Sequence, residues 1–308
     1  MLILTPHNWK DYELIDSGNG QRLERFGRYT LVRPDPQIIW KPSLQQHDWE
    51  KADAIFKRTS GDRGEWINGN NLPDKWVLRY NYISFYCKLS PFKHTGVFPE
   101  QAVHWDFIHN SISNASTSLS KYSLSEPEAN RSASLNILNL FGYTGIASLV
   151  AAQAGAKVTH VDASYPTIGW GQENQELSRL QDAPIRWILD DALKFCQREI
   201  KRGVKYDGII MDPPVFGHGP KGEVWDFNES FPKLMEVCMQ LLSDKPLFII
   251  INAYAISTSA ITLENVLKGY TNHLEGTLES GELVLQETGS QKRLLSTGIF
   301  TRWSSENI

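Results

Sequence analysis

Three apolar segments in the second half of the chain each lead into an acidic side chain. These acidic residues are Asp162, Asp191 and Asp212. The carboxyl ends of parallel strands meet at one edge of a sheet, and such sheets bind ligands in the crevice outside that edge. A carboxylate at a sheet end costs desolvation free energy unless it has a partner, so the repeated placement predicts a ligand site. The alternative for Asp191, and for Asp190 before it, is to cap the helix that follows.

A turn with two glycines, Gly142 and Gly145, joins another apolar segment to a helix-like one. Glycine allows the backbone to approach a nucleotide-like ligand closely, and the start of a helix offers unpaired N–H groups. Asp162 lies 20 positions after Gly142, where nucleotide-binding α/β units place an acid that accepts hydrogen bonds from ribose. The alternative is a tight connection without a ligand. The dinucleotide fingerprint G-x-G-x-x-G is absent.

The segment that begins at Asp212 is the most informative about the substrate. Pro213 and Pro214 restrict the backbone directly after a strand, so they would aim the Asp212 side chain at one point. Phe216 could then stack on a planar group, as enzymes that act on an extruded base require. The alternative is that Phe216 packs in the core.

The elements that position these residues alternate between strands and helices from about residue 135 onward, which predicts an α/β fold with a mostly parallel sheet. We expect strands at 135–140, 157–161, 185–189, 207–211, 247–251, 282–286 and 297–303. We expect helices at 145–154, 172–180, 192–202 and 231–242. The last two strands are expected to form an antiparallel pair at the sheet edge.

The first 95 residues predict a small β-rich domain. Its expected strands are 11–16, 22–26, 29–32, 76–80 and 83–87, with a hairpin turn at 17–20, a helix near 48–57, and a later surface loop at 114–134. We therefore expect two domains, 1–95 with a role in substrate recognition and 96–308 with the ligand site.

Composition limits the class of protein. The chain has 308 residues, a net charge of −4 and three cysteines, Cys87, Cys196 and Cys238. Its apolar runs are too short for a membrane helix, and the start of the chain resembles no signal peptide. We expect a cytoplasmic protein without a membrane or metal partner and with reduced thiols. Its acidity argues against a nonspecific electrostatic grip on nucleic acid.

Four motifs in this order resemble those of class I S-adenosylmethionine-dependent methyltransferases. They are N-L-F-G-Y-T-G at 139–145, V-D-A-S at 161–164, D-D-A at 190–192 and D-P-P-V-F-G at 212–217. They are most similar to the branch that contains the large-subunit ribosomal RNA (cytosine-C5) methyltransferases, over about residues 96–303. L-E-R-F-G at 23–27 and R-P-D-P-Q at 33–37 resemble a bacterial subgroup with an unsettled substrate. The implied fold is a Rossmann-like, seven-stranded methyltransferase sheet.

The resemblance implies S-adenosylmethionine as the cofactor. The glycine turn would wrap the methionine moiety, Asp162 would bind the ribose, and Asp191 would hold the adenine amino group. The implied cofactor residues are Pro99, Glu100, Gln101, Asn139, Phe141, Gly142, Tyr143, Thr144, Gly145, Asp162, Ala163, Ser164, Asp191, Ala192 and Asp212. In this branch the segment at 98–101 closes over the cofactor. The alternative for 98–101 is a loop that caps the next helix.

Methylation of cytosine C5 needs a thiolate that adds to C6. In the similar enzymes this cysteine follows the fifth strand, whereas here 251–257 contains no cysteine. The sequence therefore favours a nitrogen or oxygen acceptor, oriented by the catalytic candidates Asp212, Pro213, Pro214, Phe216, Asn252 and Tyr254. We expect RNA, ribosomal RNA above all, as the substrate. The alternatives are a small molecule or protein side chain as the substrate, or a cofactor-binding assembly factor without turnover.

Overall fold

The computed structural model describes residues 1–60, 63–81, 83–122, 134–254 and 256–306. The chain divides into two compact units. The first unit contains Met1–Leu4, Val103–Leu283 and Gly298–Ile308, and the second contains Thr5–Ala102 and Val284–Thr297. This division differs from the expected boundary at 95, because 96–102 and a C-terminal segment group with the N-terminal residues.

The first unit is built on a sheet with the strand order β1-β16-β17-β15-β12-β9-β10-β11. Its strands are β1 (Leu2–Leu4), β9 (Asn136–Leu140), β10 (Lys157–Asp162), β11 (Ile185–Leu189), β12 (Gly208–Met211), β15 (Phe248–Ala253), β16 (Gly276–Gln286) and β17 (Leu294–Ser305). The strands β9 to β12 and β15 are parallel, while β17 runs antiparallel to β15. The predicted fold class is confirmed. Over the described residues the sheet has one strand more than the expected seven, because β1 pairs with β16.

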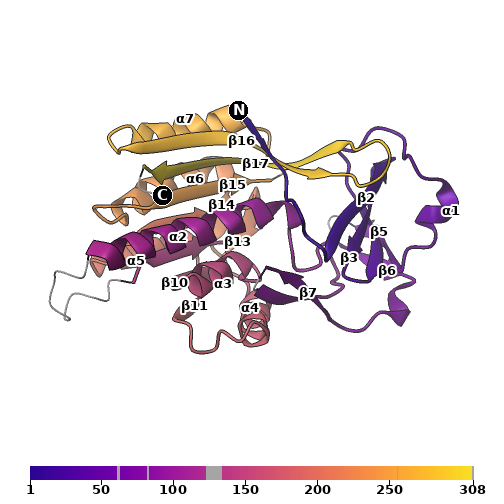
Figure 1. Ribbon diagram of the computed structural model, residues 1–308, viewed down its shortest axis with the longest axis horizontal. Helices are drawn as coiled ribbons and strands as arrows, with labels where there is room; N and C mark the ends of the chain where they lie inside the picture. The colour runs from indigo at the N-terminus through magenta and orange to yellow at the C-terminus, as the bar shows by residue number, and fades with distance from the viewer. Residues whose placement is uncertain (61–62, 82, 123–133, 255, 307–308) are drawn as a thin grey trace. The chain divides into compact units, whose positions relative to one another are not determined.

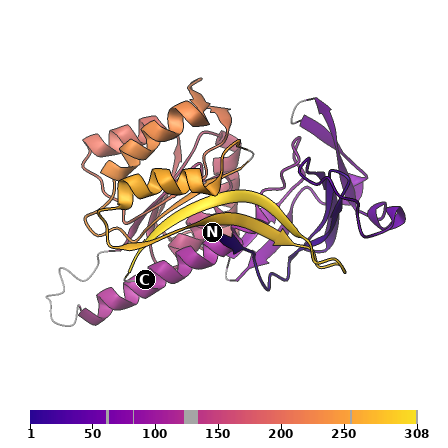
Figure 2. The same ribbon diagram turned by 90° about the horizontal axis from the view of Figure 1, so that it is seen from above.

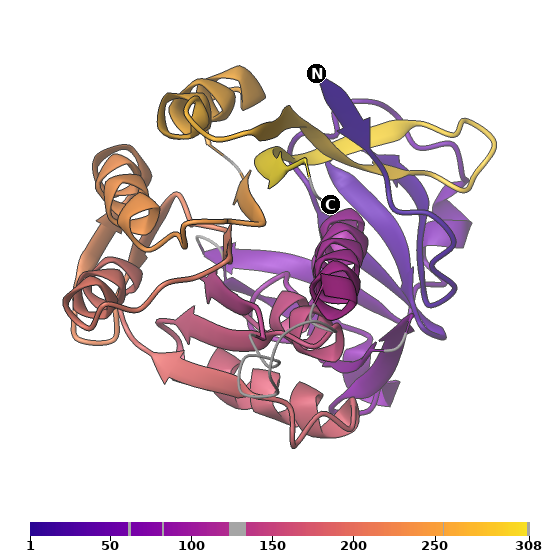
Figure 3. The ribbon, with the colours of Figure 1, turned by 60° about the vertical axis from the view of Figure 1, so that its left-hand side comes forward.

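Helices cover both faces of this sheet (Figures 1 and 3). They are α2 (Ala102–Tyr122), α3 (Ile146–Gln153), α4 (Tyr165–Leu177), α5 (Ala192–Lys201), α6 (Phe227–Gln240) and α7 (Ala260–Thr271). A core cluster of buried side chains joins one face to α5, α6 and α7, including Leu138, Phe195, Leu234 and Leu263. On the opposite face, Phe107 of α2 packs against Phe248 and Asn139 contacts α3.

Two sequence predictions in this unit are corrected. The polar stretch expected as a loop at 114–134 is helical from 114 to 122, where it continues α2, and 123–133 lies outside the described residues. The helix expected at 172–180 begins earlier, at Tyr165, with Pro166 in its first turn. Proline is compatible with the first turn of a helix, because the N–H group that it lacks has no intrahelical partner there.

The second unit contains a five-stranded and a two-stranded sheet in its described residues. Their strands are β2 (Tyr12–Gly18), β3 (Gln21–Phe26), β4 (Tyr29–Pro34), β5 (Ala54–Ser60), β6 (Arg63–Ile67), β7 (Trp76–Tyr80) and β8 (Ile83–Cys87). Asn19 and Gly20 have φ values of 51° and 76°, as expected for the predicted hairpin between β2 and β3. The helix expected near 48–57 is wrong, because only α1 (Gln46–Trp49) is helical and β5 follows it.

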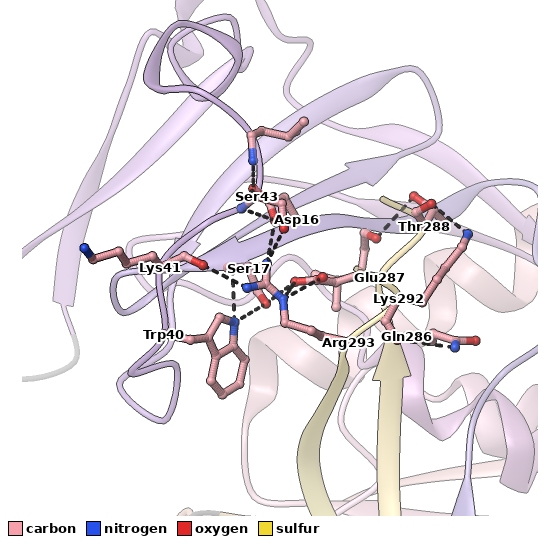
Figure 4. A network of polar contacts seen from close by, with 12 residues as sticks. Asp16, Ser17, Trp40, Lys41, Ser43, Gln286, Glu287, Thr288, Lys292 and Arg293 are labelled. Atoms are coloured by element: carbon pink, nitrogen blue, oxygen red, sulfur yellow. Dashed lines mark hydrogen bonds and ion pairs between the residues drawn. The ribbon is translucent and has the colours of Figure 1, made fainter. Parts of the chain in front are cut away.

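The strands β16 and β17 are long, with 11 and 12 residues (yellow in Figure 2). Their connecting ends, Val284–Thr297, belong to the second unit. There Arg293 forms ion pairs with Asp16 and Glu287 (Figure 4). The second unit therefore uses residues from both ends of the chain. Among the described helices, none combines the length and the apolar character that a membrane span requires.

Candidate cofactor and substrate site

The glycine turn follows β9 and has an unusual backbone. Phe141, Tyr143 and Gly145 have positive φ values of 56°, 51° and 81°. A residue with a side chain in the left-handed region costs about 1–2 kcal/mol, so Phe141 and Tyr143 need support from their surroundings. Part of this support is a hydrogen bond of 2.8 Å from the Tyr143 backbone N–H to Asp162 Oδ2.

Asp162 connects this turn to the turn after β10. Its Oδ1 accepts hydrogen bonds from the Ser164 backbone N–H and from Thr167 Oγ1, both at 2.9 Å. Burial raises the pKa of the Asp162 carboxyl, and these hydrogen bonds act in the opposite direction. The Ala163 backbone N–H also stabilises the charged form of this carboxylate. Asp162 is only half-buried, so part of the side chain stays accessible to a hydroxyl group of a ligand.

The two glycines of the turn are required by packing inside the unit. A Cβ atom on Gly142 would lie 2.3 Å from His160 Cε1. A Cβ atom on Gly145 would lie 2.5 Å from the Trp187 ring, which also lies against Gly171. The alternative of a tight connection thus explains why both residues are glycine, but it leaves the accessible backbone of the turn available to a ligand.

A buried polar chain supports the turn from the sheet. Asn139 Nδ2 donates to Ser148 Oγ at 2.9 Å, and Ser148 Oγ lies 3.0 Å from His160 Nδ1. Burial lowers the pKa of His160 to about 3, so this imidazole is neutral at physiological pH. Its ring also lies 4.4 Å from the ring of Trp187. His160 and Trp187 were not among the predicted site residues, because nothing in the spacing of the motifs indicates which rings fill the space beside the glycines.

Asp190 and Asp191 both have structural partners at the end of β11. Asp191 caps α5, since its Oδ1 accepts from the Lys194 backbone N–H at 2.9 Å. Asp190 accepts from the Asp191 backbone N–H and pairs with Arg198. One hydrogen bond to Asp191 uses only part of the acceptor capacity of a carboxylate. The cap therefore fixes the Asp191 carboxylate at the carboxyl edge of the sheet. The neighbouring strand β10 ends at the same edge with the half-buried Asp162.

The segment after Asp212 forms a hairpin that exposes Phe216. The strands β13 (Phe216–His218) and β14 (Val224–Asp226) pair antiparallel. Trp225 Nε1 donates to the Pro214 carbonyl at 2.7 Å, and the Trp225 ring contacts the ring of Phe141 at 4.9 Å. Phe216 is 58% exposed. This exposure rules out the alternative that Phe216 packs in the core.

The residues at the end of β15 differ in accessibility. Asn252 is 1% exposed, and its side chain acts on the imidazole of His104 in α2. Burial lowers the pKa of His104 to about 3. Tyr254 is half-buried and lies close to Gly298, where a Cβ atom would be 2.7 Å from Tyr254 Cε1. Asn252 therefore has a structural partner, and Tyr254 is the more accessible of the two candidates.

The segment expected to close over the cofactor lies in the second unit. Pro99, Glu100 and Gln101 form the short 3-10 helix η2 (Pro99–Gln101), and Glu100 is buried. Burial raises the pKa of Glu100, while Arg22 acts in the opposite direction. The part that this segment plays in cofactor binding stays a prediction.

All three cysteines are free thiols and are buried. Cys87 belongs to β8 in the second unit, and Cys196 and Cys238 lie in the core between α5 and α6. Burial raises the pKa of Cys87. These positions are typical of core residues. Among the described residues, no cluster of histidine, cysteine or acidic side chains is arranged to hold a metal ion.

A parallel sheet with a glycine turn and acidic residues at its carboxyl edge defines a Rossmann-like domain that binds a nucleoside-type ligand. The chain is similar to the crystal structure of an S-adenosylmethionine-dependent methyltransferase from Agrobacterium tumefaciens, with 42% identity and a TM-score of 0.90, over 99% of this chain and 94% of that one. The chain belongs to the S-adenosylmethionine-dependent methyltransferase family. The predicted enzyme class and cofactor are confirmed.

Curated relatives add a link to the ribosomal RNA branch. The ribosomal RNA large subunit methyltransferase K/L of Shewanella frigidimarina is 38% identical over 110 residues, which are 35% of this chain and 15% of that protein. The large subunit methyltransferase K of Neisseria meningitidis is 25% identical over 73% of this chain and 61% of its own length. The chain thus matches a minor part of the first and less than two thirds of the second. No family model matches the chain.

Proposed function

We propose that this enzyme transfers the methyl group of S-adenosylmethionine to a base of ribosomal RNA in the cytoplasm. The similarity to ribosomal RNA methyltransferases K/L and K supports the substrate class. The observation that carries the proposal is the exposed Phe216 ring, which follows Asp212 and two prolines at the carboxyl edge of the sheet. An exposed aromatic ring can stack on any base that leaves the RNA helix.

The residues around the glycine turn fit a nucleoside cofactor. S-adenosylmethionine supplies a methyl group that its sulfonium already activates. Asp162 would accept a hydrogen bond from a ribose hydroxyl, because its half-buried carboxylate lies at the carboxyl edge of the sheet and binds the backbone of the glycine turn. Asp191, held in place by its cap on α5, would accept from the adenine amino group.

The acceptor atom is proposed to be a nitrogen of the base. Thiolate-assisted methylation of cytosine C5 needs an accessible cysteine, and all three thiols of the chain are buried. A nitrogen acceptor requires only that its lone pair be held in line with the methyl group and that water be excluded. Asp212 and Tyr254 would orient the base, while Pro213 and Pro214 restrict the backbone that carries Asp212.

Complementation of a strain that lacks the gene tests this function. Mass spectrometry of ribosomal RNA nucleosides is expected to show one methylated nucleoside lost in the deletion strain and restored by the wild-type gene. Phe216→Ala is expected not to restore it, whereas Val224→Ala is, because Val224 is 65% exposed on the same hairpin but has no ring. An unchanged nucleoside profile in the deletion strain would favour a small molecule or protein substrate, or an assembly factor without turnover.

A further inference from the structure

The second unit contains an open pocket of about 350 Å³ whose lining shares no residue with the motifs of the cofactor site. The segment before β2, the first residues of β2 and the last residues of β16 form it, together with Thr288. Its lining includes Trp9, Lys10, Tyr12, Glu13, Gln286 and Thr288. Ligand pockets usually have volumes of roughly 300–1,000 Å³, so this one has room for a single small ligand group.

Trp9 provides a fixed aromatic wall for this pocket. Its Nε1 donates to the Arg79 carbonyl at 2.7 Å. Its ring packs against Tyr12 at 5.4 Å and edge-on against Tyr80 at 5.2 Å. Trp9 itself is only partly buried. The ring is therefore held by neighbouring side chains while part of it stays accessible, as a surface for stacking requires.

Glu13 provides a charged acceptor in the same wall. Arg25 Nε donates to Glu13 Oε2 at 3.0 Å, and Thr288 Oγ1 donates to Glu13 Oε1. Burial acts to raise the pKa of Glu13, but the hydrogen bonds from Thr288 and Arg25 outweigh it and the pKa is lowered. The side chain is thus a carboxylate with one protein donor described on each oxygen, and each oxygen can accept a further hydrogen bond.

Lys10 provides a cation at the edge of the pocket. Its side chain is exposed, while Arg25 Nη2 holds its backbone carbonyl at 3.1 Å. Gln286 and Thr288, which also line the pocket, belong to the strand end and loop that Figure 4 shows beside Lys292. An aromatic wall, a carboxylate and a cation within one pocket match the three parts of a nucleotide: the flat base, its amino group and its phosphate.

We propose that this pocket binds one unpaired nucleotide of the RNA substrate, with the base against Trp9, an exocyclic amino group donating to Glu13, and a phosphate beside Lys10. The proposal rests on the proposed function, because that function assigns RNA as the substrate. It gives the second unit a defined part in substrate recognition, outside the residues that would hold the cofactor.

Binding of labelled single-stranded oligonucleotides, followed by fluorescence anisotropy, tests the pocket. Oligocytidine and oligouridine form a matched pair of probes, since cytosine carries an amino donor where uracil carries a carbonyl acceptor. The wild-type protein is expected to prefer oligocytidine, and Glu13→Gln is expected to abolish that preference. Trp9→Phe, which retains most of the packing, is expected to lower the affinity for both probes about fivefold.

Lys10→Glu tests the phosphate contact, with Lys51→Glu as the matched control. Both lysines are exposed in the second unit, and Lys51 lies far along the chain from the pocket. Lys10→Glu is expected to weaken oligocytidine binding on the order of tenfold. It is also expected to make the slope of log affinity against log salt concentration shallower, by the amount that about one phosphate contact contributes. Lys51→Glu is expected to bind like the wild type.

Two results separate the failure of this inference from the failure of the proposed function. If the wild-type protein binds oligocytidine but Lys10→Glu and Lys51→Glu weaken it equally, or if Glu13→Gln keeps the base preference, the pocket is not a nucleotide subsite. If the wild-type protein binds S-adenosylmethionine in calorimetry but neither oligonucleotide, RNA is not the substrate. Unchanged cofactor affinity and urea midpoints show that each variant is folded.

Discussion

Arg293 and Asp16 form an ion pair of 2.9 Å although 277 positions of sequence separate them. Asp16 is 1% exposed, and so is Glu287, which Arg293 also binds, at 2.9 Å. The Arg293 guanidinium donates further hydrogen bonds to the carbonyls of Lys41 and Ser17 (Figure 4). One side chain near the C-terminus thus compensates two buried carboxylates in a unit built mainly from the first 102 residues.

Replacing Arg293 is therefore expected to destabilise the second unit strongly. Arg293→Met keeps an apolar side chain of similar length but leaves the Asp16 and Glu287 carboxylates without their cation. Breaking a buried ion pair by removing one partner costs about 3–5 kcal/mol. Lys51→Met is the control, because Lys51 pairs with Asp48 at the surface, where solvent screens the pair and its loss should hardly change stability. Urea unfolding measures both; a loss below about 1 kcal/mol in Arg293→Met would contradict the expected role.

The ion pair also shows where sequence patterns stop being informative. The strands β7 and β8 are predictable to the residue, because alternate side chains such as Trp76, Leu78 and Tyr80 are buried. The strand β1 was not predicted, since its three residues are largely exposed and only their pairing with β16 makes them a strand. Neither periodicity nor spacing indicates that a C-terminal arginine lies beside Asp16.

The same distinction holds at the candidate site. The strand ends could be predicted, because apolar runs that stop at an acid mark the carboxyl edge of a sheet. Asp191 does lie at such an end, and it also caps α5. The contacts of the two glycines with His160 and Trp187 could not be predicted, because they join the turn after β9 to side chains of two other strands, β10 and β11.

A dependence of stability on pH follows from the buried histidines His104 and His160. Burial lowers the pKa of both to about 3, whereas an unfolded histidine titrates near 6.5. Between these values the unfolded chain binds more protons, so the free energy of unfolding falls as the pH decreases from about 6.5 toward 3. Each histidine contributes a slope of up to about 1.4 kcal/mol per pH unit.

Urea unfolding between about pH 7 and pH 5 measures this slope. His160→Phe keeps a ring against Trp187 but cannot take up a proton, so we expect it to be less stable than the wild type at pH 7 and to lose less stability on acidification. Equal slopes for His160→Phe and the wild type would show that His160 does not carry the effect.

Gly145 is expected to be less tolerant of substitution than another glycine with a similar backbone. Gly145 and Gly155 have φ values of 81° and 100°, and no atom lies within 4 Å of a Cβ placed on Gly155. Gly155→Ala should lower the free energy of unfolding by only about 1–2 kcal/mol, because it places a side chain on a left-handed backbone without any overlap. Gly145→Ala adds an overlap with the Trp187 ring, for which we expect about 1–3 kcal/mol more.

Trp187→Leu in the Gly145→Ala background is the companion variant. A smaller side chain removes the overlap, so the double variant should recover part of the stability that Gly145→Ala loses. Thermal unfolding of the wild type, Gly145→Ala, Trp187→Leu and the double variant forms a cycle. Additive effects in this cycle would mean that the Trp187 ring does not restrict position 145.

Asp162→Asn is expected to weaken S-adenosylmethionine binding by more than the loss of one ligand contact. The amide oxygen can still accept from Ser164 and Thr167, but the amide nitrogen would face the Tyr143 N–H, which is also a donor. Losing that bond leaves a partly buried N–H unpaired, at a cost of about 1–3 kcal/mol, and releases a turn that depends on it for its positive φ.

Thr167→Val is the matched control for Asp162→Asn, because it removes one donor to the Asp162 carboxylate and leaves the hydrogen bond to Tyr143 in place. Calorimetry should show at least a tenfold loss of affinity for Asp162→Asn, about 1.4 kcal/mol, and a smaller loss for Thr167→Val. If the two variants bind the cofactor equally well, Asp162 does not act through the Tyr143 turn. If both bind like the wild type, the ribose is held elsewhere.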